Sequence, residues 1–170
     1  RTGGPEVRDQ LVGVDWLKSQ PFVDESRIAI QGWSYGGYMT LMTVLQAPEG
    51  TFAAAAAGAP VTDWRLYDTF YTERYMDTPE DNPGGYEASS VFPYVDNLTT
   101  PLLLMHGMAD DNVTFDNTTR LMAALQEKGK AFDLMTYPGQ RHGIRGEALQ
   151  VHLMKTRMAF LDRHLKDPSR

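Results

Sequence analysis

Residues 27–37, Arg-Ile-Ala-Ile-Gln-Gly-Trp-Ser-Tyr-Gly-Gly, constrain the fold more than any other part of the chain. A short β-branched run leads to Ser34, which stands between Gly32 and Gly36, and an apolar helix-like run over 38–46 follows. A Gly-x-Ser-x-Gly pattern between a strand and a helix predicts a sharp turn, in which a strained serine points its hydroxyl outward. A serine in this context is typical of a catalytic nucleophile.

Hydrophobic spacing and turn residues divide the rest of the chain into alternating elements. Helices are predicted over 7–19, 35–46, 115–128 and 151–165, and strands over 27–31, 52–57, 102–105 and 131–137. The alanine run in 52–57 could also form a helix, but its short length between turn signals favours a buried strand. The alternation predicts an α/β fold with three layers and a mostly parallel sheet of about four strands.

Composition narrows the class of protein. The 170 residues are expected to form one domain, with no second domain in this chain. A net charge of −6 with scattered Lys and Arg argues against a nucleic-acid partner, and the lack of cysteine excludes disulfides and thiolate catalysis. Neither a metal nor a cofactor is expected. The start at Arg1, without an initiator methionine or a signal peptide, is interpreted as a cut or processing site.

A serine nucleophile needs a base that accepts its proton, and four histidines are candidates. His152 and His164 lie within the last predicted helix, where packing or surface roles are the ordinary interpretation. His106 ends a buried apolar strand and is interpreted as a packing residue satisfied by backbone. His142 lies in the loop after the last strand, where it can swing over the end of the sheet. His142 is therefore the predicted base.

The candidate acid follows the third predicted strand, where Asp110 and Asp111 are adjacent. Asp110 is nearer the strand end and is the predicted partner of the histidine, whereas Asp111 is expected to form a turn or cap the next helix. The chain order Ser34, Asp110, His142 is that of the α/β-hydrolase fold. All three would lie at the carboxyl ends of strands, where catalytic residues gather in sheets of this kind.

These residues predict acyl transfer through a covalent intermediate. Ser34 would attack a carbonyl carbon, His142 would carry its proton to the leaving group, and Asp110 would stabilise the imidazolium. The backbone amide of Tyr35 is expected to donate to the oxyanion, a contribution of about 3 kcal/mol. A second oxyanion donor is expected from a loop upstream of the nucleophile strand, outside this chain.

Four segments together resemble the prolyl oligopeptidase family of serine peptidases, and within it the dipeptidyl peptidase IV branch. They are residues 32–38 (Gly-Trp-Ser-Tyr-Gly-Gly-Tyr), 67–76, 106–113 (His-Gly-Met-Ala-Asp-Asp-Asn-Val) and 142–144. The resemblance covers nearly the whole chain and assigns the catalytic triad to Ser34, Asp110 and His142. It implies that residues 1–170 are the C-terminal part of a peptidase catalytic domain with a partial α/β-hydrolase fold.

The resemblance also implies a substrate pocket in the excursion between the second and third strands. Four aromatic residues there fall at helical spacing: Trp64, Tyr67, Tyr71 and Tyr75. A packed aromatic stripe is the plain interpretation. By resemblance, five residues would instead form a flat apolar pocket for a proline ring: Tyr67, Tyr71, Val61, Trp64 and Val113. Asn112 would hold the carbonyl of the penultimate residue, with a turn or cap as its alternative role.

Further implications concern parts expected outside this chain. The family's catalytic domain is partnered with a β-propeller, which supplies two glutamates for the substrate's amino terminus, and an upstream tyrosine completes the oxyanion hole. The expected activity is cleavage after proline or alanine, releasing N-terminal dipeptides from peptides with a penultimate proline. Without its neighbouring strand, the edge at 27–31 would be bare, so the isolated segment is predicted to be inactive or nearly so. A homodimer and a secreted or periplasmic location are suggested by resemblance alone.

Three alternatives stay open at this point. A prolyl tripeptidyl peptidase or an acylaminoacyl peptidase of the same family would share the triad and differ in how it measures the amino end of the substrate. A lipase or esterase fits the triad alone. From another class, a catalytically silent relative would act as a binding protein.

Overall fold

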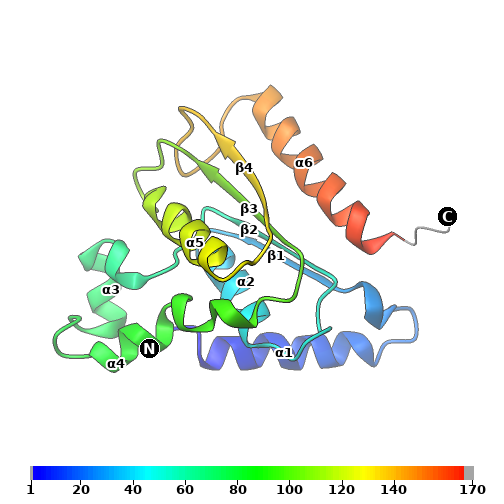
Figure 1. Ribbon diagram of the computed structural model, residues 1–170, viewed down its shortest axis with the longest axis horizontal. Coiled ribbons are helices and arrows are strands. Elements are labelled where there is room, and N and C mark those ends of the chain that lie inside the picture. Colours follow the sequence, from blue (N-terminus) through cyan, green and yellow to red (C-terminus); the bar gives the residue numbers. More distant parts are fainter. Residues whose placement is uncertain (1, 167–170) are drawn as a thin grey trace.

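A single parallel sheet organises the computed structural model, which describes residues 2–166 and leaves Arg1, the suggested processing site, outside the described residues. Its four strands, in spatial order, are β1 (Ala29–Trp33), β2 (Ala54–Gly58), β3 (Leu102–Gly107) and β4 (Asp133–Tyr137). Each neighbouring pair is parallel, so the four carboxyl ends lie at one edge of the sheet (Figure 1). The predicted α/β class and parallel sheet are confirmed.

Helices cover both faces of the sheet and make three layers (Figure 1). One face packs against α1 (Pro5–Lys18), α2 (Tyr35–Gln46) and α5 (Asp116–Glu127). The other face packs against α6 (Glu147–Leu165), through Phe160 and Leu161. None of the helices in the described residues has the combined length and apolar character of a membrane span.

The alanine run forms the strand that its flanking turns predict. Ala55 and Ala57 face the α2 side of the sheet, whereas Ala54 and Ala56 face α6. Alanine is a strong helix former in isolation, but β2 is fully buried and its backbone pairs with strands on both sides. Pairing and burial on two faces therefore override the intrinsic preference.

Between β2 and β3 the chain forms an excursion with two short helices, α3 (Thr69–Met76) and α4 (Pro83–Ser89). The aromatic stripe from Trp64 to Tyr75 is not one continuous helix. Trp64 begins a 3-10 helix, Tyr67 has an extended backbone, and the Asp68 side chain caps α3 by accepting from the Tyr71 amide. The rings nevertheless pack together, with 5.8 Å between the stacked centroids of Trp64 and Tyr71.

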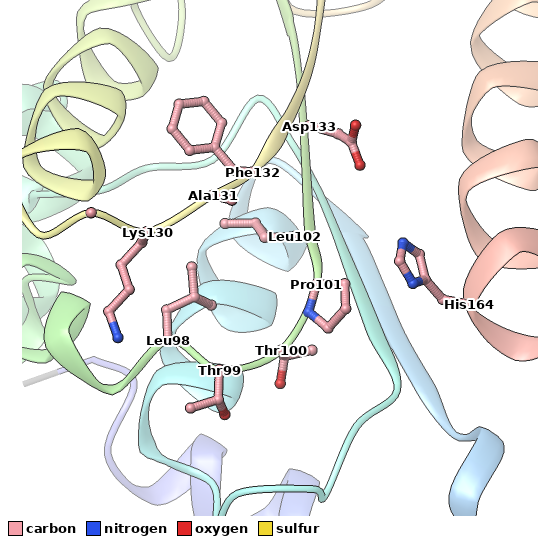
Figure 2. Close-up of a pocket in the computed structure, with 11 residues that line it drawn as sticks. Leu98, Thr99, Thr100, Pro101, Leu102, Lys130, Ala131, Phe132, Asp133 and His164 are labelled. Carbon is pink, nitrogen blue, oxygen red and sulfur yellow. The ribbon is translucent and has the colours of Figure 1, made fainter.

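A hollow of about 450 Å³ opens at the other end of the sheet, where β3 and β4 begin. Figure 2 shows Pro101 and Leu102 on one side of it and His164 from α6 on the other. Because the hollow lies at the amino ends of the strands, it is remote from the edge where Ser34, Asp110 and His142 follow their strands.

Candidate active site

Ser34 occupies a strained turn between β1 and α2. Its backbone has φ 60° and ψ −120°, a region that costs a non-glycine residue about 1–3 kcal/mol. The turn is secured because the Ser34 amide donates to the Gly58 carbonyl at 2.8 Å and its carbonyl accepts from the Tyr38 amide at 3.0 Å. A Cβ atom on Gly32 would collide with the backbone of Gly36. The turn therefore requires glycine at position 32.

The fold brings Ser34, His142 and Asp110 into hydrogen-bonding distance, although they lie on three separate loops. Ser34 Oγ is 2.9 Å from His142 Nε2, and His142 Nδ1 is 2.8 Å from Asp110 Oδ2. A carboxylate only accepts, so Nδ1 carries the proton and Nε2 is left to accept from the serine hydroxyl. This is the arrangement in which an imidazole can act as a general base toward Ser34.

Asp110 is held by four contacts in a fully buried position. Its Oδ1 accepts from the backbone amides of Asn112 and Val113, at 2.9 and 3.1 Å. Its Oδ2 faces two histidine nitrogens, from His142 and from His106. Asp111 instead lies exposed and pairs with Arg141 at 2.7 Å, which leaves it without a contact to the histidine among the described interactions.

The loop that carries His142 is docked onto the loop after β3. The Met108 and Ala109 amides donate to the carbonyls of Tyr137 and Gln140, at 3.0 and 2.9 Å. A side chain on Gly107 would collide with the carbonyls of Gln140 and Arg141, so glycine allows the two loops to approach.

Trp33 also restrains the loop that carries His142, a role that the sequence alone did not predict. Its indole Nε1–H donates to the His142 carbonyl at 2.9 Å. The ring lies directly against Gly58 of β2, where a Cβ atom would overlap it. The position of Trp33, immediately before the nucleophile and at a strand end, is the only sequence signal that could have marked it.

His106 was expected to be satisfied by backbone, and this prediction is incomplete. The ring is fully buried, and only one of its three contacts is to backbone, the Val113 carbonyl at 2.9 Å from Nε2. Nε2 also lies 3.1 Å from Asp110 Oδ2, and Nδ1 lies 2.7 Å from Thr118 Oγ1. Burial lowers the pKa of His106, and the Val113 and Asp110 contacts oppose this only in part. The spacing of His106 four residues before Asp110 was the available sequence signal.

Tyr35 is the first residue of α2, where the helix leaves backbone amides without intrahelical acceptors. Its amide follows Ser34 directly, and its role as an oxyanion donor stays a prediction. The phenol of Tyr35 points elsewhere and donates to Glu6 Oε1 at 3.1 Å. Burial, with the nearby Glu6 carboxylate, raises the pKa of Tyr35, so the phenol remains protonated as this donor.

The predicted pocket residues divide into two groups. Tyr67 and Tyr71 are partly buried with edge-to-face rings 5.6 Å apart, and the Tyr67 hydroxyl donates to Asn112 Oδ1 at 2.7 Å. The other three are buried in the main core: Val61, Trp64 and Val113. Among residues 2–166 no group of three or more His, Asp or Glu side chains is placed to hold a metal ion.

Comparison with known proteins identifies the family. A model of the Prolyl oligopeptidase family matches residues 1–168. Dipeptidyl peptidase 8 of Mus musculus is 44% identical over 162 residues, covering 91% of this chain and 18% of the relative. A probable dipeptidyl-aminopeptidase B of Botryotinia fuckeliana is 48% identical over 145 residues, covering 84% of this chain and 16% of the relative.

A solved structure agrees with these matches. The chain resembles Porphyromonas gingivalis dipeptidyl peptidase 4 with a TM-score of 0.93 and 42% identity, covering 97% of this chain and 23% of that one. The protein therefore belongs to the prolyl oligopeptidase family, with an α/β-hydrolase fold, as the sequence motifs predicted. The chain spans less than a fifth of the length of the curated relatives described above.

Proposed function

We propose that this chain carries the catalytic triad of a serine exopeptidase that cleaves after proline or alanine and releases N-terminal dipeptides. The observation that supports it best is the pair of contacts at the centre of the site. Ser34 Oγ lies 2.9 Å from His142 Nε2, and His142 Nδ1 lies 2.8 Å from Asp110 Oδ2.

In the proposed reaction, Ser34 Oγ attacks the scissile carbonyl while His142 Nε2 takes its proton. The Tyr35 amide donates to the developing oxyanion. His142 then protonates the leaving amine, and an acyl-enzyme remains on Ser34. Water activated by the same imidazole attacks this ester and releases the dipeptide. Asp110 accepts from His142 Nδ1–H throughout and stabilises the imidazolium.

The proposed proline pocket uses the aromatic cluster beside the nucleophile. Tyr67 and Tyr71 would face the proline ring, while Val61, Trp64 and Val113 would support them from the core. Asn112, whose Oδ1 accepts from the Tyr67 hydroxyl, keeps its amide N–H groups for a substrate carbonyl. A pocket of this kind distinguishes ring sizes by about 1–3 kcal/mol per methylene.

The test is a Ser34→Ala variant of the full-length protein, assayed with a Gly-Pro chromogenic substrate. We expect kcat to fall by about 10⁶-fold, because the nucleophile is lost, and fluorophosphonate labelling to disappear. Ser26→Ala, at an exposed serine on the 3-10 helix before β1, is the matched control and should keep full activity. A parent protein that takes no label, or that prefers blocked or tripeptidyl substrates, would overturn the proposal.

A further inference from the structure

His106 lies at the end of β3, directly behind the proposed catalytic acid. Its ring is fully buried, and Phe115 packs edge-on against it with 5.4 Å between ring centroids. Three polar atoms surround its two nitrogens, all within 3.1 Å: Val113 O, Asp110 Oδ2 and Thr118 Oγ1. The imidazole therefore has a defined partner at each nitrogen and no contact with solvent.

These partners determine the tautomer. The Val113 carbonyl can only accept, so the nitrogen 2.9 Å from it, Nε2, must carry the proton. Nδ1 then accepts from the Thr118 hydroxyl at 2.7 Å. The Nε2–H group is consequently shared between the Val113 carbonyl and Asp110 Oδ2, which lies 3.1 Å away.

Within the described residues, the titratable groups that face this assembly are few. The Asp110 charge acts to raise the pKa of His106, whereas His142 acts to lower it. The Asp110 charge also contributes to raising the pKa of the Tyr67 phenol. Burial lowers the pKa of His106, so its ring is neutral at neutral pH. A neutral donor can restrain the carboxylate without cancelling its charge, whereas a cation in this place would form a permanent ion pair with it.

We infer that His106 is a positioning residue, whose Nε2–H fixes Asp110 Oδ2, the oxygen that also accepts from His142 Nδ1. This inference rests on the proposed function, because it gives the acid of the proposed triad a second partner. Asp110 Oδ1 is already held by two backbone amides, so His106 completes the restraint on the carboxylate plane. Because His106 shares Oδ2, Asp110 stabilises the imidazolium form of His142 less strongly than an unshared carboxylate would.

The test compares His106→Leu and His106→Gln in the full-length protein, using the pH dependence of kcat/KM with a Gly-Pro chromogenic substrate. Leucine removes the His106 donor, so His142 no longer shares Asp110 Oδ2 with a second N–H group. We expect the acid limb to move up by about 0.5 pH unit. We also expect kcat to fall about tenfold, because the carboxylate is less well oriented. Glutamine can place an N–H near the position of Nε2. His106→Gln should therefore recover most of the parental kcat and return the acid limb close to its parental position.

Leu121→Ala is the matched control for a purely structural role. Leu121 is buried on α5 in the main core and is not a member of the proposed triad. It should lower the unfolding temperature and leave the acid limb in place. An acid limb in His106→Leu that is unchanged or lower than in the parent would overturn the inference. So would a glutamine variant that behaves like leucine.

Failure of this inference is distinguishable from failure of the proposed function. If Ser34→Ala retains turnover or the parent takes no fluorophosphonate, the proposed function is wrong. If the parent is active and Ser34-dependent but His106→Leu keeps the parental pH profile, only the positioning role is wrong.

Discussion

Gly32 and Gly36 flank the nucleophile symmetrically in the sequence, but their surroundings differ. Alanine at Gly32 would collide with the Gly36 backbone, whereas a Cβ atom on Gly36 meets nothing within 4 Å. We expect Gly32→Ala to lower the unfolding temperature and abolish labelling of Ser34. Gly36→Ala should fold at least as well, because alanine favours the first turn of α2 by about 1 kcal/mol. Calorimetry and fluorophosphonate labelling of full-length variants check this, and equal damage from both would contradict it.

At the scale of elements, one hydrogen bond links the end of β1 to the loop after β4. The indole Nε1–H of Trp33 donates to the His142 carbonyl at 2.9 Å. Trp33→Phe keeps an aromatic ring and removes this bond, worth about 0.5–1.5 kcal/mol. We expect kcat/KM to fall roughly threefold to tenfold, while the unfolding temperature falls by only about 2–4 °C. Trp16→Phe, on an exposed part of α1, is the matched control and should leave kcat/KM unchanged. Parental kcat/KM in Trp33→Phe would show that the bond does not position His142.

At the scale of the whole molecule, β1 is an edge strand among the described residues. An edge of this kind exposes unpaired backbone groups and favours association. We therefore expect the isolated 170-residue chain to be inactive or nearly so, and to associate in solution. Turnover of a Gly-Pro chromogenic substrate and light scattering measure the two effects. Robust turnover by the monomeric isolated chain would show that residues 1–170 alone form a working site.

Local patterns predict the framework well, because each strand and helix is encoded by nearby residues. All four predicted strands and the four longer helices are present, with ends displaced by a few residues. β1 begins at Ala29 rather than 27, since Asp24 caps a 3-10 helix that occupies the preceding residues. The excursion was less predictable. Its aromatic spacing fits a helix, but capping by Asp68 restarts the helix after Tyr67.

The strand–glycine–serine–helix segment and the loops after later strands were sufficient to predict the fold class and to name Ser34, Asp110 and His142 as candidates. Their mutual distances, the shared contact of His106 with Asp110, and the indole of Trp33 on the His142 loop come only from the tertiary structure. The physical reason is that Trp33 and His142 are 109 residues apart in sequence. Parallel pairing of the strands, rather than any local pattern, places the loops that carry them at one edge of the sheet.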